Sequence, residues 1–302
     1  SSAVTVVDAS KSDTEMVEAK DSYTVAMIYQ DLSQEFNIYF QNVMSTRCAE
    51  AGITLLEFDG RSDTETQLNQ CENAIASGAD ALLFIPFDKD GAAPIIDNCN
   101  EAGIPVICCN NITTNVDQAT AYVGANDVEA GIMETEYIVD LIGGKGNIAV
   151  VEGPFGHSAQ VARQEGLEQV LAGYPDCKIV LDDTANWNRD EAMELVENWI
   201  AGGTQIDAII CHNDIMAMGA LQACQDAGLE IPIIGIDATY DALCAVKDGT
   251  LAADVYQDVY GQAEEAFNVC MRILNGETFE QTTYVPFKLI TKDNVDEYLA
   301  NF

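Results

Sequence analysis

The sequence predicts an α/β fold with two doubly wound parallel-sheet lobes, and two features of the chain support this. Short apolar runs rich in Ile, Val and Ala alternate with helix-period segments from residue 23 onward. Such runs are typical of parallel strands that are buried on both faces. One pattern also occurs twice: residues 78–110 and 207–237 both contain Asp-Ala, an apolar run, a helical segment, Ala-Gly, Ile-Pro and a second apolar run with a polar end. This repeat and the length of 302 residues agree with about two domains.

The elements can be predicted in order along the chain. Residues 1–22 are small, polar and charged, so we expect a linker there. Because strands and helices then alternate, right-handed crossovers and parallel sheets are expected in both halves. Strands are predicted at 24–29, 54–59, 81–85, 104–109, 119–124, 147–153, 178–183, 208–211, 231–236 and 250–256, with a final extended segment at 282–290. Helices are predicted at 35–50, 63–77, 91–101, 128–141, 160–172, 189–201, 214–227, 239–248 and 258–275.

The composition excludes several classes of partner. The chain has 13 basic and 50 acidic residues, which give a formal net charge of -37 at pH 7. Such a surface repels phosphate backbones, so no nucleic-acid partner is expected. Anionic membrane surfaces and anionic ligands are disfavoured as well. A neutral small-molecule ligand fits best.

The cysteines, histidines and glycine-rich turns show no pattern for a metal or a cofactor. The ten cysteines have no C-x-x-C spacing and the chain has two histidines, so we expect no metal site. Cys108 and Cys109 fit successive positions of a buried strand, with a redox role as the alternative. The turn at 143–146 is not a phosphate loop, and no nucleophile elbow or H-E-x-x-H motif occurs. We therefore expect no cofactor and no enzymatic activity.

Polar residues stand at the ends of three predicted strands. They are Asn110, Asn213 and Asp237. Open α/β sheets bind ligands at the carboxyl ends of their strands. An amide both donates and accepts hydrogen bonds and a carboxylate accepts them, so this set suits a polyol. Asn213 has an alternative role as a helix cap, and capping is favoured for Asp214.

Several segments along the chain have an order and spacing that match one known family. They are Phe36 after the first strand and its polar loop, IPVI with its polar end at 104–110, VGANDVEAG at 123–131, GPFGHSAQVARQEG at 153–166, DTANW at 183–187, CHNDIMAMGA at 211–220, GID at 235–237 and VYQD at 255–258. Together they resemble the type I periplasmic sugar-binding proteins of ABC transporters, with the galactose/glucose-binding and ribose-binding proteins as the most similar members. The resemblance covers about residues 23–291.

The resemblance implies how the two lobes are built. They are joined by a hinge of three crossover strands, so each lobe is discontinuous in sequence. After the linker at 1–22, the N-terminal lobe comprises 23–125 and 258–286, and the C-terminal lobe comprises 126–257 and 287–302. A sugar is enclosed between the lobes by a hinge motion.

The resemblance also implies which residues contact the sugar. Phe36 and Trp187 are expected to stack on the apolar faces of the sugar ring, with core packing as the alternative for Phe36. For Arg163 the alternative is a salt bridge on a helix face. Trp199 is expected to serve packing alone. The polar contacts are expected from Gln34, Asn37, Asn110, Asn111, His157, Arg163, Asn213, Asp237 and Gln257.

Three departures from the family pattern leave the particular sugar open. Ala159 stands where the galactose type has a ligand aspartate, and Val161 aligns with an arginine of the ribose type. The GGKG turn at 143–146 occupies the place of the calcium loop of some galactose-type members. No structural calcium is therefore expected.

The function that follows is that of an extracytoplasmic solute-binding protein. It is expected to capture a neutral monosaccharide, either a hexose such as glucose or galactose or a pentose, and to deliver it to the permease of an ABC importer. The alternative is a sugar sensor without a transport role. A repressor of the same fold would need a helix-turn-helix, which residues 1–22 do not provide. We expect a monomer that is periplasmic or lipid-anchored at the outer face of the cell membrane, since residues 1–22 resemble the start of an exported protein after removal of its targeting segment.

Overall fold

The computed structural model describes residues 4–7, 9, 12 and 14–302, which form two compact units. The first unit comprises the described residues up to Ala125 together with Asp258–Val285, and the second comprises Asn126–Gln257 and Pro286–Phe302. The chain passes between the units at 125–126, 257–258 and 285–286, outside the helices and strands. Pro286, which the sequence places in the first lobe, belongs to the second unit because it begins the segment that leads to that unit's last strand.

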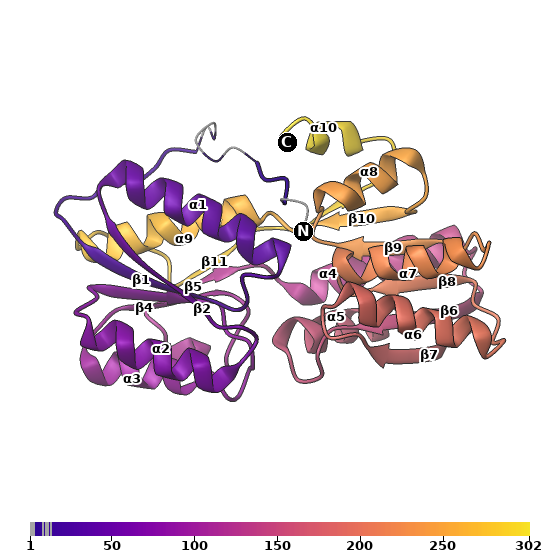
Figure 1. Ribbon diagram of the computed structural model, residues 1–302, viewed down its shortest axis with the longest axis horizontal. Helices are drawn as coiled ribbons and strands as arrows, with labels where there is room; N and C mark the ends of the chain where they lie inside the picture. The colour runs from indigo at the N-terminus through magenta and orange to yellow at the C-terminus, as the bar shows by residue number, and fades with distance from the viewer. Residues whose placement is uncertain (1–3, 8, 10–11, 13) are drawn as a thin grey trace. The chain divides into compact units, whose positions relative to one another are not determined.

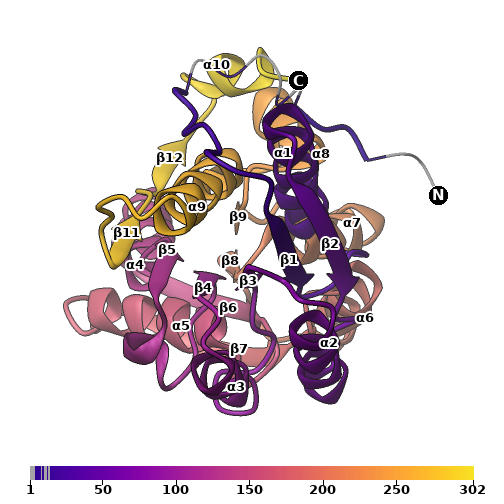
Figure 2. The ribbon, with the colours of Figure 1, turned by 90° about the vertical axis from the view of Figure 1, so that its left-hand side faces the viewer.

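Within the described residues, the first unit is built around a six-stranded sheet in which all pairings are parallel. Its strand order is β11-β5-β4-β3-β1-β2 (Figure 2). The strands are β1 (Thr24–Tyr29), β2 (Thr54–Asp59), β3 (Ala81–Phe84), β4 (Val106–Asn110), β5 (Ala121–Gly124) and β11 (Thr282–Tyr284). The helices are α1 (Glu35–Ala51), α2 (Thr64–Ala76), α3 (Pro94–Ala102), the 3-10 helix η2 (Val116–Gln118) and α9 (Val259–Leu274).

Helices cover both faces of this sheet, and the strand sequences reflect it. α1 and α9 lie on one face, and α2 and α3 lie on the other (Figure 1). In β1, Ala26 and Ile28 belong to the core beneath α2 and α3, so Val25, Met27 and Tyr29 point to the opposite face. All five side chains are buried. This double burial explains why the run TVAMIY has no polar alternation.

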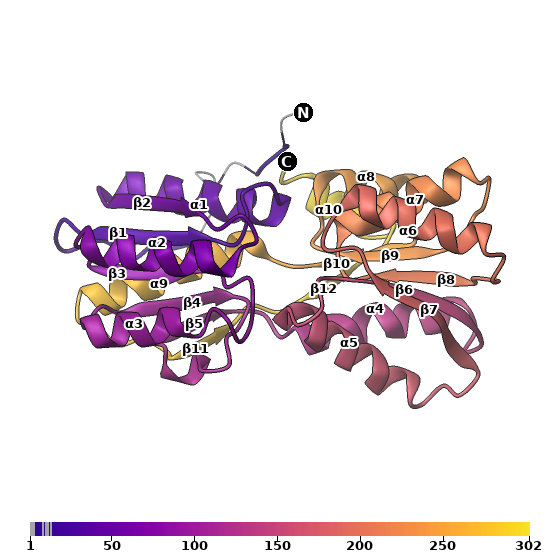
Figure 3. The ribbon, with the colours of Figure 1, turned by 60° about the horizontal axis from the view of Figure 1, so that its bottom comes forward.

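The second unit repeats this plan with one reversed strand. Its sheet has the order β12-β10-β9-β8-β6-β7, and β12 runs antiparallel to β10 while the other pairings are parallel. Figure 3 shows α4 and α5 on one face and α6, α7 and α8 on the other. The strands are β6 (Gly146–Glu152), β7 (Cys177–Thr184), β8 (Ala208–Cys211), β9 (Ile233–Ile236), β10 (Ala253–Tyr256) and β12 (Lys288–Ile290). The helices are α4 (Asp127–Leu141), α5 (Ser158–Leu171), α6 (Arg189–Ala201), α7 (Asp214–Asp226), α8 (Tyr240–Asp248) and α10 (Val295–Leu299).

The C-terminal segment differs from its prediction. The extended stretch predicted at 282–290 is not one strand, because it divides into β11 in the first sheet and β12 in the second. Pro286 lies at the division, where the lack of an N–H does not weaken a strand pairing. α10 was not predicted, since its 5 residues are too few to show a helical period.

The stretch predicted as a linker packs against the first unit in the part that the structure describes. Oδ1 of Asn268 on α9 accepts the backbone N–H of Val17 at 2.8 Å. The carbonyl oxygen of Ala9 accepts a hydrogen bond from Nη2 of Arg47 on α1 at 2.9 Å. The segment expected to be a linker therefore makes defined contacts with the first unit, because side chains of α1 and α9 satisfy polar groups of an irregular backbone.

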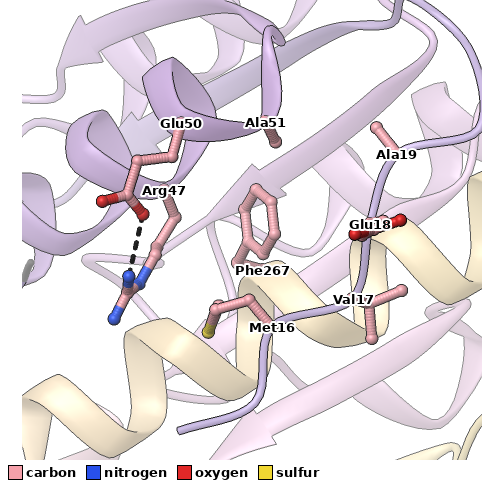
Figure 4. A pocket seen from close by; sticks show the side chains of 8 residues that line it. All are labelled: Met16, Val17, Glu18, Ala19, Arg47, Glu50, Ala51 and Phe267. Carbon is pink, nitrogen blue, oxygen red and sulfur yellow. Dashed lines mark hydrogen bonds and ion pairs between the residues drawn. The ribbon is translucent and has the colours of Figure 1, made fainter. Parts of the chain in front are cut away.

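A cavity of about 330 Å³ lies between this segment, α1 and α9 (Figure 4). Beside it, Arg47 pairs with Glu50 at 2.8 Å and with Glu264 at 2.7 Å. No residue that was predicted to contact a ligand lines this cavity, so we do not assign it to the ligand. The lining residues are Met16, Val17, Glu18, Ala19, Arg47, Glu50, Ala51 and Phe267.

Replacing Arg47 with methionine should destabilise the first unit strongly. The side chains of Arg47 and Glu264 are both 6% exposed, so the substitution leaves a buried carboxylate without its cation. We expect the free energy of unfolding to fall by about 3–5 kcal/mol. Urea unfolding followed by circular dichroism measures the loss.

The exposed pair of Arg61 and Asp59 supplies the control for this experiment. Arg61 lies 3.9 Å from the carboxylate and its side chain is 79% exposed, so Arg61→Met should cost less than about 1 kcal/mol. Adding Glu264→Leu to Arg47→Met should recover much of the loss, because no unpaired charge remains. Equal effects of the Arg47 and Arg61 substitutions would contradict the role given to the buried pair.

Candidate ligand-binding site

Arg163 connects several polar strand and helix ends in the second unit. It lies on α5 and is 4% exposed. Its Nε donates to Oδ1 of Asp127 at 2.9 Å, and its Nη2 lies 2.8 Å from the same oxygen. Nη1 donates to the carbonyl oxygen of His212, and Nη2 also reaches Oε1 of Gln257 at 3.5 Å. The guanidinium therefore ties the start of α4 to the residues that follow β8 and β10.

Two glycines let α5 approach α4 closely enough for this contact. A Cβ atom on Gly131 of α4 would overlap the carbonyl oxygen of Arg163. A Cβ atom on Gly166 of α5 would overlap the carbonyl oxygen of Val128. Because both positions lack a side chain, the two helix backbones pack directly on each other and the Arg163 side chain reaches Asp127. The ion pair is thus buried between helices rather than placed on an exposed helix face.

The charges near Arg163 alter one another's protonation. Burial lowers the pKa of Arg163, but Asp127, Asp237 and Glu134 together outweigh burial and raise it. Burial raises the pKa of Asp127 above its ordinary value, and Arg163 opposes the rise. Burial also raises the pKa of Glu134 well above its ordinary range, again against Arg163. Arg163 therefore stays charged, and its field extends to Asp237 at the end of β9.

Trp187 and His157 form an aromatic corner next to Arg163. The two rings meet edge to face, with centroids 5.3 Å apart and an interplanar angle of 82°. The guanidinium of Arg163 lies 5.7 Å from the centre of a Trp187 ring, within the range of a cation–π contact. Trp187 has a φ of 57°, which non-glycine residues adopt at a cost, and a Cβ atom on Gly153 would overlap its indole. Packing therefore holds the indole in one place.

Both histidines of the chain are held neutral. His157 caps α5, with its Nδ1 accepting the N–H of Ala159 at 3.2 Å. Nδ1 of His212 accepts the N–H of Gly153 at 3.5 Å. Burial, followed by the charge of Arg163, lowers the pKa of each imidazole to about 3. The site therefore presents neutral imidazoles at physiological pH.

Asn213 and Asp237 end their strands in different ways. Asn213 is the N-cap of α7, and its Oδ1 accepts the N–H of Met216 at 3.0 Å, so the capping alternative describes its local contact. Asp214 does not cap α7 as favoured from the sequence; its Oδ2 instead accepts the N–H of Thr239 at 2.7 Å. Asp237 has a φ of 131° and is 9% exposed. Backbone strain of this kind is found where a structure must aim a side chain.

The predicted residues of the first unit make a separate network. Asn110 ends β4 with a φ of 57°, and its Nδ2 donates to Oε1 of Gln262 at 3.0 Å. Oδ1 of Asn37 accepts the backbone N–H of Gln30 at 3.1 Å. Nδ2 of Asn111 donates to Oε1 of Gln30 at 2.9 Å and to the carbonyl oxygen of Pro86 at 3.0 Å. The amides of Asn37 and Asn111 thus brace the loops that follow β1, β3 and β4.

Two further predicted residues lie at the start of α1. Gln34 is the N-cap, but its side chain makes no capping hydrogen bond. Phe36 is half-buried rather than part of the buried core. Both therefore keep accessible side-chain surface near the carboxyl end of β1.

Sequence reasoning missed four residues of these networks: Gln30, Asp127, His212 and Gln262. Gln30 and His212 directly follow β1 and β8, so their positions at strand ends could have identified them. Asp127 lies in the VGANDVEAG segment, where it starts α4 beside an asparagine cap. Gln262 lies within α9 with nothing in its local sequence to single it out. Among the described residues, no cluster of three or more His, Cys, Asp or Glu side chains could hold a metal ion.

Comparison with known proteins identifies the family. A family model described as a periplasmic binding protein domain matches residues 25–278. A xylitol-binding protein of Mycolicibacterium smegmatis is 38% identical over 255 residues, covering 84% of this chain and 73% of that protein. The ribose import binding protein of Bacillus subtilis is 28% identical over 273 residues, 90% of this chain and 88% of that protein. The chain belongs to the periplasmic binding protein family, among the sugar-binding proteins of ABC transporters.

Solved structures confirm the fold class. A solute binding protein of an ABC transporter from Bacillus halodurans, with bound myo-inositol, superposes with a TM-score of 0.90 at 37% identity and covers 94% of this chain and 100% of its own. A myo-inositol binding protein of Caulobacter gives a TM-score of 0.89 at 27% identity, with 95% and 100% coverage. In the described part of the chain, the helices are too short or too polar to cross a bilayer.

Substituting Gly153 with alanine should displace Trp187. The Cβ atom would overlap the indole, while the backbone of Gly153 does not require a glycine. We expect altered tryptophan fluorescence in a Trp199→Phe background and an overpacking cost of about 1–3 kcal/mol. Gly173→Ala is the matched control, because the nearest atom to its Cβ would be a carbonyl oxygen at 3.4 Å. An unchanged spectrum for Gly153→Ala would contradict the close contact.

The neutral histidines predict how stability depends on acid pH. In the unfolded chain the imidazoles gain protons below about pH 6.5, whereas in the folded protein their pKa values are lowered to about 3. The imidazoles of the unfolded state bind more protons than those of the folded state in this window, so the histidine contribution to stability should fall as the pH drops from about 6.5, by up to about 1.4 kcal/mol per pH unit for each histidine. Asp127 and Glu134, whose pKa values are raised in the folded protein, contribute in the opposite direction. Urea unfolding between these limits checks the slope, and His212→Asn should flatten it. Imidazole NMR resonances of the native protein that titrate near neutrality would contradict the burial.

Proposed function

We propose that the protein is an extracytoplasmic solute-binding protein that captures a neutral sugar or polyol and delivers it to the permease of an ABC importer. The observation that carries the proposal is the Asp237 carboxylate, held at a strained strand end in the field of Arg163, whose guanidinium lies 5.7 Å from the centre of a Trp187 ring. A carboxylate accepts hydroxyl groups, a guanidinium donates to them, and an indole face covers the C–H surface of a ring. These are the groups that a polyhydroxylated ligand requires.

The ligand class follows from charge and from the relatives. The net charge of -37 disfavours anionic sugars, so sugar acids and sugar phosphates are poor candidates. The similar proteins are described as binding xylitol, ribose and, with a bound ligand, myo-inositol, all of which are neutral polyols or pentoses. We therefore place this ligand among neutral pentoses, hexoses, and linear or cyclic polyols.

Both units are proposed to contribute to binding. The second unit supplies Trp187, His157, Arg163, Asn213, Asp237 and Gln257, and the first supplies Gln34, Phe36, Asn37, Asn110 and Asn111. In the first unit, Asn110 is the strongest candidate, because it has a strained backbone at a strand end like that of Asp237. We propose that binding proceeds without turnover and that the protein acts as a monomer, as the family's role in solute capture implies.

A calorimetric panel tests the ligand class. We expect one of myo-inositol, xylitol, ribose, allose, glucose and galactose to bind with a Kd near 1 μM, or about -8 kcal/mol. Glucuronate and glucose 6-phosphate serve as charged controls and should bind at least about 100-fold more weakly, since the acidic surface repels them. Absence of any binding below millimolar across the neutral set would refute the proposal.

Changing Asp237 tests the position of the site. Asp237→Ala should weaken binding at least about tenfold, or about 1.4 kcal/mol. Asp237→Asn should also weaken binding. Because asparagine tolerates the positive φ better than alanine does, a loss of affinity in Asp237→Asn cannot be assigned to backbone strain. Asp241→Ala, at an exposed acid of α8, is the control. Unchanged affinity in both Asp237 variants would show that the site lies elsewhere.

A further inference from the structure

Two fully buried aspartates lie next to each other in the second unit, and neither belongs to the set of predicted ligand residues. Asp254 is on β10 and Asp214 begins α7, and both are 0% exposed. No group in the described chain makes a hydrogen bond of normal geometry to either carboxyl oxygen of Asp254. The backbone N–H of Ala238 is near enough to oppose the rise of its pKa, but no cation pairs with this carboxyl. A buried carboxylate with so little compensation is costly, so this arrangement requires an explanation.

The strand register brings the two carboxyl groups together. Asp254 on β10 is the register partner of Gly235 on β9. A Cβ atom on Gly235 would overlap Oδ1 of Asp214. The carboxyl of Asp214 therefore occupies the space that the missing side chain of Gly235 leaves, directly beside Asp254. Two adjacent carboxylates repel each other, so these two carboxyl groups attract each other only if they share a proton.

Asp214 in turn holds the backbone that carries Asp237. Its Oδ2 accepts the N–H of Thr239 at 2.7 Å, and Thr239 is the N-cap of α8. Between β9 and α8 the backbone is strained, with φ of 131° at Asp237 and 60° at Ala238. Such a turn persists only where surrounding contacts fix it. The bond from Asp214 to Thr239 is one such contact.

We propose that Asp254 is a positioning residue of the ligand site: its carboxyl keeps a proton and donates it in a hydrogen bond to Asp214, which in turn holds Thr239 and so the turn that presents Asp237. The inference rests on the proposed function for its effect on ligand affinity. The protonated acid and the hydrogen-bond chain themselves do not depend on which ligand binds.

The electrostatic surroundings agree with a retained proton. Burial is the largest cause that raises the pKa of Asp254 well above its ordinary value, followed by the negative charges of Asp214 and then Asp237, while the backbone of Ala238 opposes them. Arg163 is engaged with Asp127, and the charges that act most strongly on Asp254 are the negative charges of Asp214 and Asp237.

The elements packed against β10 are β9, β12, α4 and α8, and their ionisable groups do not replace this proton. On α8, Lys247 is exposed and pairs with Asp296 at 2.8 Å. On α4, Glu134 acts on Arg163, and the hydroxyl of Tyr137 donates to the carbonyl oxygen of Ala252. The remaining groups are Glu129, Glu136 and Asp140 on α4, Lys288 on β12, and Tyr240, Asp241, Cys244 and Asp248 on α8. Of these Cys244 is half-buried and the others are exposed.

The pH dependence has a definite sign. An aspartate of the unfolded chain loses its proton near pH 3.9, whereas Asp254 of the folded protein keeps it to a higher pH. The contribution of this proton to stability is complete below about pH 3.9 and is lost as the pH rises through the folded pKa. Above that pKa two adjacent negative charges should push Asp214 away from Thr239, so ligand affinity should fall on the alkaline side.

Two substitutions separate positioning from simple packing. Asp254→Asn keeps the shape and supplies a permanent N–H donor, so it should retain the neutral-pH affinity within about threefold and lose the alkaline fall. Asp254→Leu removes the donor at similar size and should weaken binding about tenfold or more at every pH. Affinity for the strongest binder among myo-inositol, xylitol and ribose is measured by calorimetry from acid to alkaline pH. An alkaline fall that persists unchanged in Asp254→Asn would overturn the proposal.

Two ligand-free measurements keep the test independent of the proposed function. The infrared spectrum of the native protein minus that of Asp254→Asn should show the carbonyl stretch of a protonated carboxylic acid at neutral pH. The difference spectrum is used because Glu134 and Glu152 also have raised pKa values and contribute carbonyl bands of their own. Hydrogen exchange of the Thr239 amide should accelerate in Asp254→Leu but stay slow in Asp254→Asn. If no polyol binds, the proposed function fails while these readouts still decide the hydrogen-bond chain. Absence of the carbonyl band from the difference spectrum, or equal Thr239 exchange in all three proteins, would overturn the inference.

Discussion

The buried ion pair between Arg163 and Asp127 is the contact on which the second unit's polar strand ends depend. In a chain with 50 acidic and 13 basic residues, several carboxyl groups are buried in this unit, and each is costly without a compensating charge. Arg163 compensates the charge of Asp127 by a direct ion pair and that of Asp237 through its electrostatic field. Because its fork of donors also reaches the carbonyl of His212, the same side chain fixes the backbone beyond β8. One residue therefore both compensates the buried carboxylates and positions the backbone that follows β8.

That contact exists only because two helices pack at backbone distance. Gly131 and Gly166 remove the side chains that would separate α4 from α5, and this allows a long side chain to run between them. The same device recurs at Gly153 under Trp187 and at Gly235 under Asp214. In each case an absent Cβ makes room for the one large or charged group that the site needs. In this unit the glycines therefore make room for buried polar and aromatic side chains, in addition to allowing a densely packed core.

Much of the fold could be predicted from the sequence, and some candidate site residues could be named from it. Unbroken apolar runs predict strands that are buried on both faces, such as β1, and periodic apolar positions predict helices. Both hydrophobic patterns follow directly from which faces of the element are buried. Asn110 and Asp237 were singled out by their positions at strand ends and Trp187 by the family resemblance, and all three have positive φ. Residues such as Gln262 and Asp254 could not be found in this way, since each sits inside a regular element and gains its role only from a partner distant in the chain.

The sequence by itself determined the α/β class, the order of the strands and helices and the family, because these depend on local periodicity and the order of motifs. The tertiary structure decided which polar groups meet. It showed that Asn213 caps a helix, that Asp214 holds the turn after Asp237, and that residues expected to be a linker pack on α1 and α9. Hydrogen-bond partners and buried charges are set by contacts between elements far apart in sequence, and no local pattern encodes those distances.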